Sequence, residues 1–137
     1  MRLLLVTSIL LCLASCGFFS ERQDQINFLY ENSKLYRLDS VEIKSFHEEN
    51  SGMFGKDRLI VAIYRVPNLD KVLFQSGLTS LGYRKLPASD LILENSFAGD
   101  TKSTDQGYYL RQEDSNESEL IVILNFTRNK IFIYKRA

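Results

Sequence analysis

The sequence has few residues of the kinds that carry metal, redox and nucleophile chemistry. Only one of its 137 residues is histidine and only two are cysteine, at positions 12 and 16. His47 begins the run His-Glu-Glu-Asn, but a zinc-protease motif needs a second histidine one helical turn later, and the chain has none. No nucleophile-elbow pattern surrounds a serine. We therefore predict no catalytic residue and a protein that is not an enzyme.

The sequence also lacks an excess of either charge. Seventeen Lys and Arg balance seventeen Asp and Glu, and the two signs are interspersed along the chain. The pair Lys135-Arg136 is too small to be the basic footprint of a nucleic-acid-binding surface. With 45% apolar and 25% charged residues, the composition is typical of a folded globular chain of one domain. We expect no nucleic-acid partner.

The first residues have the organisation of an export signal. Met1-Arg2 is a minimal positive region, and the run Leu3 to Leu13 is apolar except for Thr7 and Ser8. The run ends in Leu13-Ala14-Ser15-Cys16, which resembles the lipobox of bacterial lipoproteins: Leu, two small residues and Cys. The resemblance covers about the first seventeen residues, and the mature domain resembles no family that we recognise.

The lipoprotein resemblance implies cleavage by signal peptidase II between Ser15 and Cys16. Cys16 would then become the first residue, carrying an S-diacylglycerol and an N-acyl chain such as palmitate. Each buried lipid methylene contributes about 0.8 kcal/mol, so several chains hold a protein stably on a membrane. Gly17 follows instead of the Asp that favours inner-membrane retention in enteric bacteria. For a Gram-negative source this favours the outer membrane, facing the periplasm, over the inner membrane.

The same resemblance removes thiol chemistry from the mature chain. Cys12 would be discarded with the signal peptide and Cys16 would be acylated, leaving no free thiol and no disulfide. A chain with one histidine and no free cysteine cannot form a Cys/His zinc site. We predict no cofactor and no metal.

Two alternatives for the N-terminus compete with the lipoprotein interpretation. Residues 3–20 carry no charge and reach the lower limit for a membrane-spanning helix, so an uncleaved anchor is one alternative. Polar residues within that stretch and the missing aromatic and basic anchor beyond it disfavour a span. A plain secretory signal, with Cys16 as an ordinary thiol, is the other alternative.

Three segments follow from this interpretation. Residues 1–15 are the cleaved signal peptide, residues 16–23 are the lipidated cysteine and its tether, and residues 24–137 form a single domain. An extended tether of seven residues reaches about 25 Å, so the domain would stay close to the membrane.

Hydrophobic periodicity predicts an α+β domain, with an antiparallel sheet of about four to six strands and one or two helices packed on it. The expected helices cover residues 25–36 and 68–81, the second ending at Gly82. The expected strands cover 40–47 and 58–66 as a hairpin, 108–114, 119–126 and 130–136 as a meander, and a short piece at 90–97.

Two of the strands are apolar without alternation, at Leu59 to Ile63 and Leu120 to Leu124. Such a strand is covered on both faces of its sheet. We expect the helix over 68–81 to cover one face, and either the N-terminal helix or an outside partner to cover the other. An apolar face left uncovered would mark a partner site.

Several local patterns are interpreted as ordinary features. Segment 51–57, Ser-Gly-Met-Phe-Gly-Lys-Asp, lacks the spacing of a phosphate loop and is expected to be a hairpin turn. The acidic segment 113–119 lacks the spacing of a calcium loop and is expected to be a solvated hairpin tip. His47 is expected to be an ordinary strand-end residue. Half-buried aromatics of the sheet and loops are expected at Tyr36, Tyr83, Tyr108 and Tyr109.

The sequence favours a small lipid-anchored protein of the bacterial cell envelope that is not an enzyme. Its partners would be the membrane, through the lipid on Cys16, and another protein of unknown identity. Such a protein could be an envelope accessory factor or an immunity or inhibitor lipoprotein. One alternative is a module that binds a small ligand or lipid between the 68–81 helix and the sheet. A third is a small envelope hydrolase that uses carboxylates or His47.

Overall fold

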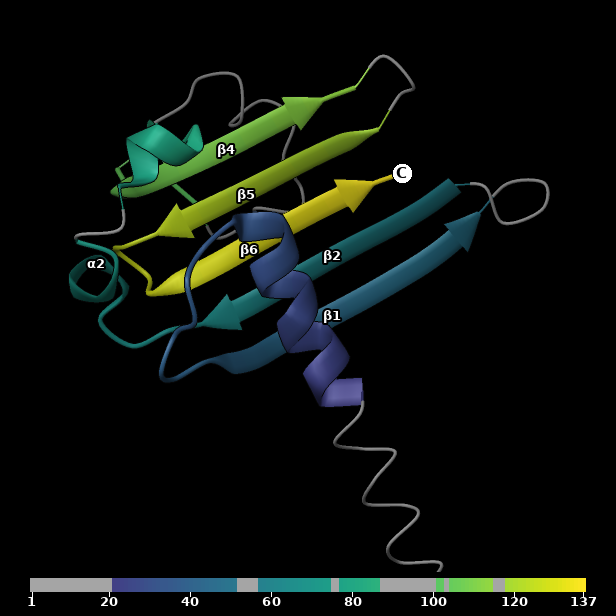
Figure 1. Cartoon of the computed structure of the whole chain (residues 1–137), viewed down its shortest axis with the longest axis horizontal. Coiled ribbons are helices and arrows are strands. Elements are labelled where there is room, and N and C mark those ends of the chain that lie inside the picture. Colours follow the sequence, from purple (N-terminus) through teal and green to yellow (C-terminus); the bar gives the residue numbers. More distant parts are fainter. Residues whose placement is uncertain (1–20, 52–56, 75–76, 87–100, 103, 115–117) are drawn as a thin grey trace, which may run out of the picture.

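The computed structural model describes residues 21–51, 57–74, 77–86, 101–102, 104–114 and 118–137. These residues form a six-stranded antiparallel sheet with the strand order β1-β2-β6-β5-β4-β3 (Figure 1). A helix over residues 21–33 lies across one face of it. The strands are β1 (Glu42–Ser51), β2 (Asp57–Arg65), β3 (Arg84–Lys85), β4 (Gly107–Glu113), β5 (Glu119–Asn125) and β6 (Lys130–Arg136). The predicted α+β class and strand number are confirmed.

The local strand pairings follow the prediction. β1 and β2 form the expected antiparallel hairpin, with Ser51 opposite Asp57 in register. β4, β5 and β6 form the expected meander. The pairing of β2 with β6, in which Ala62 lies opposite Ile133, joins hairpin and meander into one sheet. This contact between distant parts of the chain places β6 in the interior of the sheet.

The N-terminal helix is held against the rest of the fold by both apolar and polar contacts. Leu29 is fully buried in the main core. The hydroxyl of Tyr64 donates to the carbonyl of Gln25 at 2.7 Å, and that of Tyr83 donates to the carbonyl of Ser33 at 2.6 Å. Burial raises the pKa of both tyrosines well above the ordinary value, so both hydroxyls stay protonated donors.

The extent of this helix differs from the expectation. It includes residues 21–23, which we predicted to belong to the tether, and it ends at residue 33 instead of 36. Tyr36 consequently lies beyond the helix and is 82% exposed. Tyr83, in contrast, is buried in the core. Both tyrosines were expected to be half-buried, and that prediction is wrong for each.

The single helix predicted over 68–81 is wrong. The chain instead forms a short α2 (Leu69–Val72) and a separate 3₁₀ turn η2 (Leu78–Leu81). Gly77 adopts a left-handed conformation at φ 59°, which a continuous right-handed helix does not allow. Gly82 ends η2 at φ 97°, as its predicted place at the end of a helix requires.

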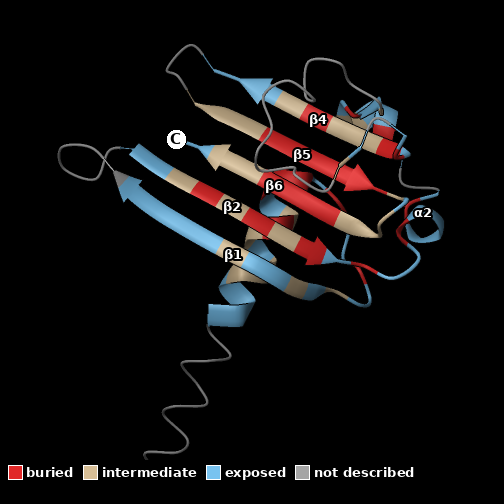
Figure 2. Cartoon of the chain, turned by 180° about the vertical axis from the view of Figure 1, so that it is seen from behind, coloured by how far each residue is buried: buried red, intermediate tan, exposed pale blue. Residues whose placement is uncertain are grey.

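Both helical regions lie on the same face of the sheet, which contradicts the expected cover of opposite faces. Leu29 shares one core cluster with Leu69, Leu73 and Leu78. The other face carries a smaller cluster, whose strands are seen in Figure 2. It is formed by Ile121, Ile123 and Phe132 with the partly buried Ile63, Leu86, Tyr109 and Tyr134. The apolar pattern of a strand shows that both faces are buried, but it does not show which helix covers which face.

One strand was missed and one expected strand lies outside the described residues. β3 is only two residues long and pairs Arg84 with Tyr109, too short for an alternating pattern to reveal it. The strand expected at 90–97 falls where the structure describes nothing.

Candidate functional site

The predicted lipid site lies outside the described residues, as do Ser15 and the cleavage position before Cys16. Within the described part of the chain, no helix has both the length and the apolar character needed to cross a membrane.

His47 lies within β1 instead of at the end of a strand. Its ring nitrogen Nε2 is 2.8 Å from Oε1 of Glu49, and both side chains are largely exposed. This contact between two surface residues of one strand forms no enclosed site around the imidazole.

The acidic segment 113–119 is described only in part, because residues 115–117 fall outside. Of its carboxylates, Glu113 lies 2.7 Å and Glu119 lies 3.9 Å from the guanidinium of Arg111. Among the described residues, no three His, Cys, Asp or Glu side chains come together as a metal site would require. Of segment 51–57, which we expected to be a hairpin turn, Ser51 and Asp57 face each other in the β1–β2 register, and residues 52–56 lie outside the described residues.

The adjacent tyrosines of β4 point to opposite faces. Tyr108 packs against Phe126, with ring centroids 5.7 Å apart, beside the main core. Tyr109 packs in the smaller cluster on the far face. Both are half-buried, as expected for these two residues.

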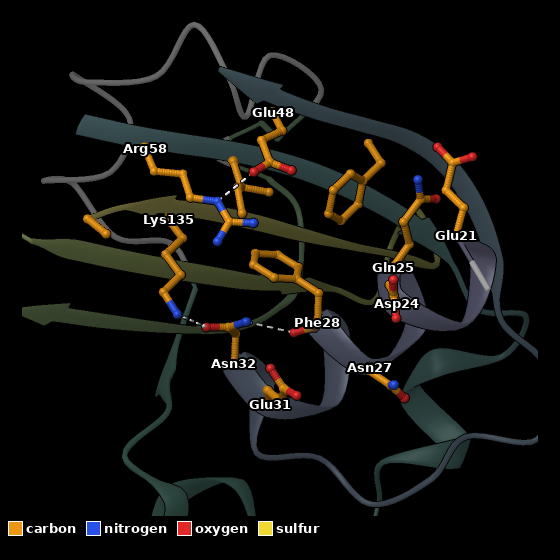
Figure 3. Close-up of a pocket in the computed structure, with 13 residues that line it drawn as sticks. Glu21, Asp24, Gln25, Asn27, Phe28, Glu31, Asn32, Glu48, Arg58 and Lys135 are labelled. Atoms are coloured by element: carbon orange, nitrogen blue, oxygen red, sulfur yellow. Dashed lines mark hydrogen bonds and ion pairs between the residues drawn. The ribbon is translucent and has the colours of Figure 1, made fainter. Parts of the chain in front are cut away.

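A groove lies between the N-terminal helix and the sheet. It has a volume of about 670 Å³ and lies where the helix crosses β1, β2 and β6 (Figure 3). The helix forms one wall and the three strands form the other. The helix contributes Glu21, Asp24, Gln25, Asn27, Phe28, Glu31 and Asn32, and the sheet side contributes Phe46, Glu48, Arg58, Ile60, Lys135 and Ala137.

The floor of this groove is apolar. Phe28 of the helix meets Phe46 of β1 edge to face, with ring centroids 5.4 Å apart and an interplanar angle of 82°. Both rings are only partly buried, and Ile60 of β2 lies beside them almost fully buried. Edge-to-face packing is a favourable arrangement for two aromatic rings, so Phe28 and Phe46 form one contiguous apolar surface within a lining that is otherwise mostly polar.

The two cations on the sheet side are held by polar partners. Nε of Arg58 is 2.6 Å from Oε1 of Glu48. Nζ of Lys135 donates to Oδ1 of Asn32 at 2.9 Å, while Nδ2 of Asn32 donates to the carbonyl of Phe28 at 2.7 Å. Figure 3 shows these contacts along the sheet side of the groove and at the end of the helix. Asn32 is buried and therefore fixes the position of the lysine.

The helix wall carries a row of carboxylates. Glu21, Asp24 and Glu31 are exposed and share one stripe with Phe28, because their spacing of three, four and three residues keeps them on one side of a helix. Within the described residues, none of the three carboxylates forms an ion pair. The groove thus has four carboxylates against two cations, and three of those carboxylates lie on the helix side.

A second polar cluster surrounds Asp105, whose carboxylate is 4% exposed. Its Oδ2 accepts hydrogen bonds from the Lys102 backbone N–H at 2.8 Å, Asn125 Nδ2 at 3.0 Å and Arg128 Nε at 3.0 Å. Burial alone raises the pKa of Asp105, but these three donors outweigh it and hold the pKa below its ordinary value. The cluster joins the segment before β4 to the turn between β5 and β6.

No local pattern in the sequence indicates the sheet side of the groove. Its sheet wall combines Phe46, Glu48, Ile60 and Lys135 from three strands. Their neighbourhood depends on the β2–β6 pairing, which no local pattern shows. The helix wall could have been noticed from the periodic acidic stripe around Phe28.

Comparison of the chain with models of protein families, with curated proteins and with solved structures found no match.

Proposed function

We propose that this is a small lipid-anchored protein of the bacterial cell envelope, not an enzyme, that binds another protein. The observation that carries the proposal is the groove beside the N-terminal helix, whose apolar floor of Phe28, Phe46 and Ile60 lies between charged walls. An apolar centre with a polar rim is the usual anatomy of a protein–protein contact. The lipobox resemblance at Cys16 supports the anchor.

The chemistry of the lining residues supports binding over catalysis. Histidine, cysteine, serine and threonine are all missing from the residues that line the groove, so a serine or cysteine nucleophile paired with a histidine base is not assembled there.

Site-specific photo-crosslinking in cells tests this proposal. A photoreactive amino acid replaces Asn27, an exposed residue on the groove rim, and separately replaces Thr79, an exposed residue of η2 outside the groove. We expect a discrete crosslinked species of defined mass from position 27 and none from position 79. Equal crosslinking from both positions, or none from either, would contradict the proposal.

The alternative, a module for a small ligand or lipid, was expected to use a pocket between the 68–81 segment and the sheet. Leu69, Leu73 and Leu78 of that segment are buried in the main core and occupy the space beneath it. The groove is the better location for such a ligand. Native mass spectrometry of the protein purified from cells separates the two proposals, because a small ligand would add a fixed mass.

A further inference from the structure

The groove differs from a generic apolar cleft in the sign and placement of its charges. Arg58 is neutralised by Glu48, and Lys135 is directed to the amide oxygen of Asn32. The carboxylates of the helix wall have no such partner among the described residues. A ligand that enters the groove therefore meets three carboxylates on the helix side, while Lys135 is the one cation of the lining that no carboxylate of the described residues neutralises.

We infer that the groove binds a basic amphipathic peptide segment of the partner protein. An apolar side chain of the segment contacts the floor formed by Phe28, Phe46 and Ile60. Lysine or arginine side chains on either side of it extend to the carboxylates of Glu21, Asp24 and Glu31. The inference rests on the proposed function, because it specifies the chemistry of the partner at the same groove.

The dimensions of the groove fit this occupant. A volume of about 670 Å³ lies within the range of about 300–1,000 Å³ that is usual for ligand sites, and it is large enough for a few side chains of an extended peptide. Glu21 and Glu31 are ten residues apart, which on an α-helix corresponds to about 15 Å. An extended peptide spans that distance with about five residues, so basic residues on both sides of one apolar residue can reach opposite ends of the carboxylate row.

Charge complementarity also predicts how the binding responds to salt. Exposed ion pairs are weak one at a time, about 0.2–1 kcal/mol, and they weaken as the ionic strength rises. The apolar contact with the floor does not share this dependence. A basic peptide should therefore lose affinity in high salt, whereas a neutral peptide with the same apolar residues should not.

Calorimetric titration of the full chain in a non-ionic detergent, with three amidated pentapeptides, tests the inference. The peptides are Lys-Phe-Lys-Leu-Lys, its glutamine analogue Gln-Phe-Gln-Leu-Gln and its glutamate analogue Glu-Phe-Glu-Leu-Glu. We expect the lysine peptide to bind about tenfold more tightly than the glutamine peptide, and the glutamate peptide to bind most weakly. Raising the salt from 50 to 300 mM should reduce the first affinity several-fold and leave the second unchanged.

Substitutions inside and outside the groove test whether the peptides bind there. Asp24→Asn and Glu31→Gln should each weaken the lysine peptide about threefold and leave the glutamine peptide unaffected. Asp70→Asn, which changes an exposed carboxylate in α2 outside the groove, should affect neither peptide. Phe46→Leu should weaken both peptides, and a thermal melt of the same sample shows whether the fold is retained.

Three results would overturn the inference: equal or tighter binding of the glutamine or glutamate peptide, no binding of any peptide, or equal effects of Asp24→Asn and Asp70→Asn. If crosslinking from Asn27 succeeds while the peptides fail in one of these ways, the protein partner stands and only its basic chemistry is wrong. If crosslinking fails as well, the proposed function is wrong too.

Discussion

Asp105 shows how single polar residues can organise an irregular part of this chain. Its buried carboxylate accepts hydrogen bonds from three donors, which belong to Lys102, Asn125 and Arg128. Gly107, two residues later, passes so close to β5 that a Cβ would lie 1.9 Å from the Leu124 carbonyl oxygen. The carboxylate and the glycine together fix the entry of the chain into β4.

Replacing Asp105 should destabilise the protein in a pH-dependent way. Asp105→Ala should lower the free energy of unfolding by about 2 kcal/mol at pH 7, because buried donors lose their acceptor. The pKa of Asp105 is lowered in the folded state. Its contribution is therefore complete above the unfolded-state pKa of about 4 and is lost as the pH falls through the folded value.

Urea denaturation at pH 7 and pH 3 measures this effect. The difference in the free energy of unfolding between wild type and Asp105→Ala should shrink at pH 3. Asp105→Asn is the matched variant, since it keeps the shape of the side chain and removes the titrating group. A difference of the same size at both pH values would show that the ionised carboxylate contributes nothing.

At the scale of the elements, the N-terminal helix connects stability with the proposed function. Leu29 inserts into the main core, Tyr64 and Tyr83 hold the backbone of the helix, and the same helix presents Phe28 and the carboxylates to the groove. Because the helix packs over β1, β2 and β6, the width of the groove depends on how firmly Leu29 is seated.

Truncating the Leu29 side chain should therefore strongly lower the stability of the fold. Leu29→Ala should lower the free energy of unfolding by about 3 kcal/mol, since it removes a fully buried side chain and leaves a cavity. Val72→Ala is the control, because Val72 is 48% exposed and its truncation should cost well under 1 kcal/mol. Denaturant titration compares the two variants, and equal costs would mean that the helix is not anchored in the core.

The sequence predicts these elements well where local pattern decides them. The alternation of Val41 and Ile43 with polar neighbours and the turns of the meander indicate strands that the structure contains. The sequence predicts an element poorly where a single backbone angle or a contact between distant residues determines its extent. Gly77 is an example, because its left-handed conformation interrupts the expected 68–81 helix. The groove and the Asp105 cluster both depend on residues at least 20 positions apart, so spacing in the sequence does not reveal them.

At the scale of the whole molecule, the proposed anchor places the groove near the membrane. The helix wall begins with Glu21, five residues after Cys16. Five extended residues span at most about 18 Å, so with a lipid on Cys16 this end of the groove would lie within about 20 Å of the bilayer surface. Under the proposed anchor, a partner that binds in the groove would itself have to approach the membrane surface.

Mass spectrometry of the N-terminal tryptic peptide, taken from protein purified out of native membranes, tests the anchor most directly. We expect a peptide that begins at Cys16 and ends at Arg22, with the added mass of a diacylglycerol and one N-linked acyl chain on Cys16. A peptide with unmodified Cys16, or a chain that still carries residues 1–15, would contradict the lipid anchor.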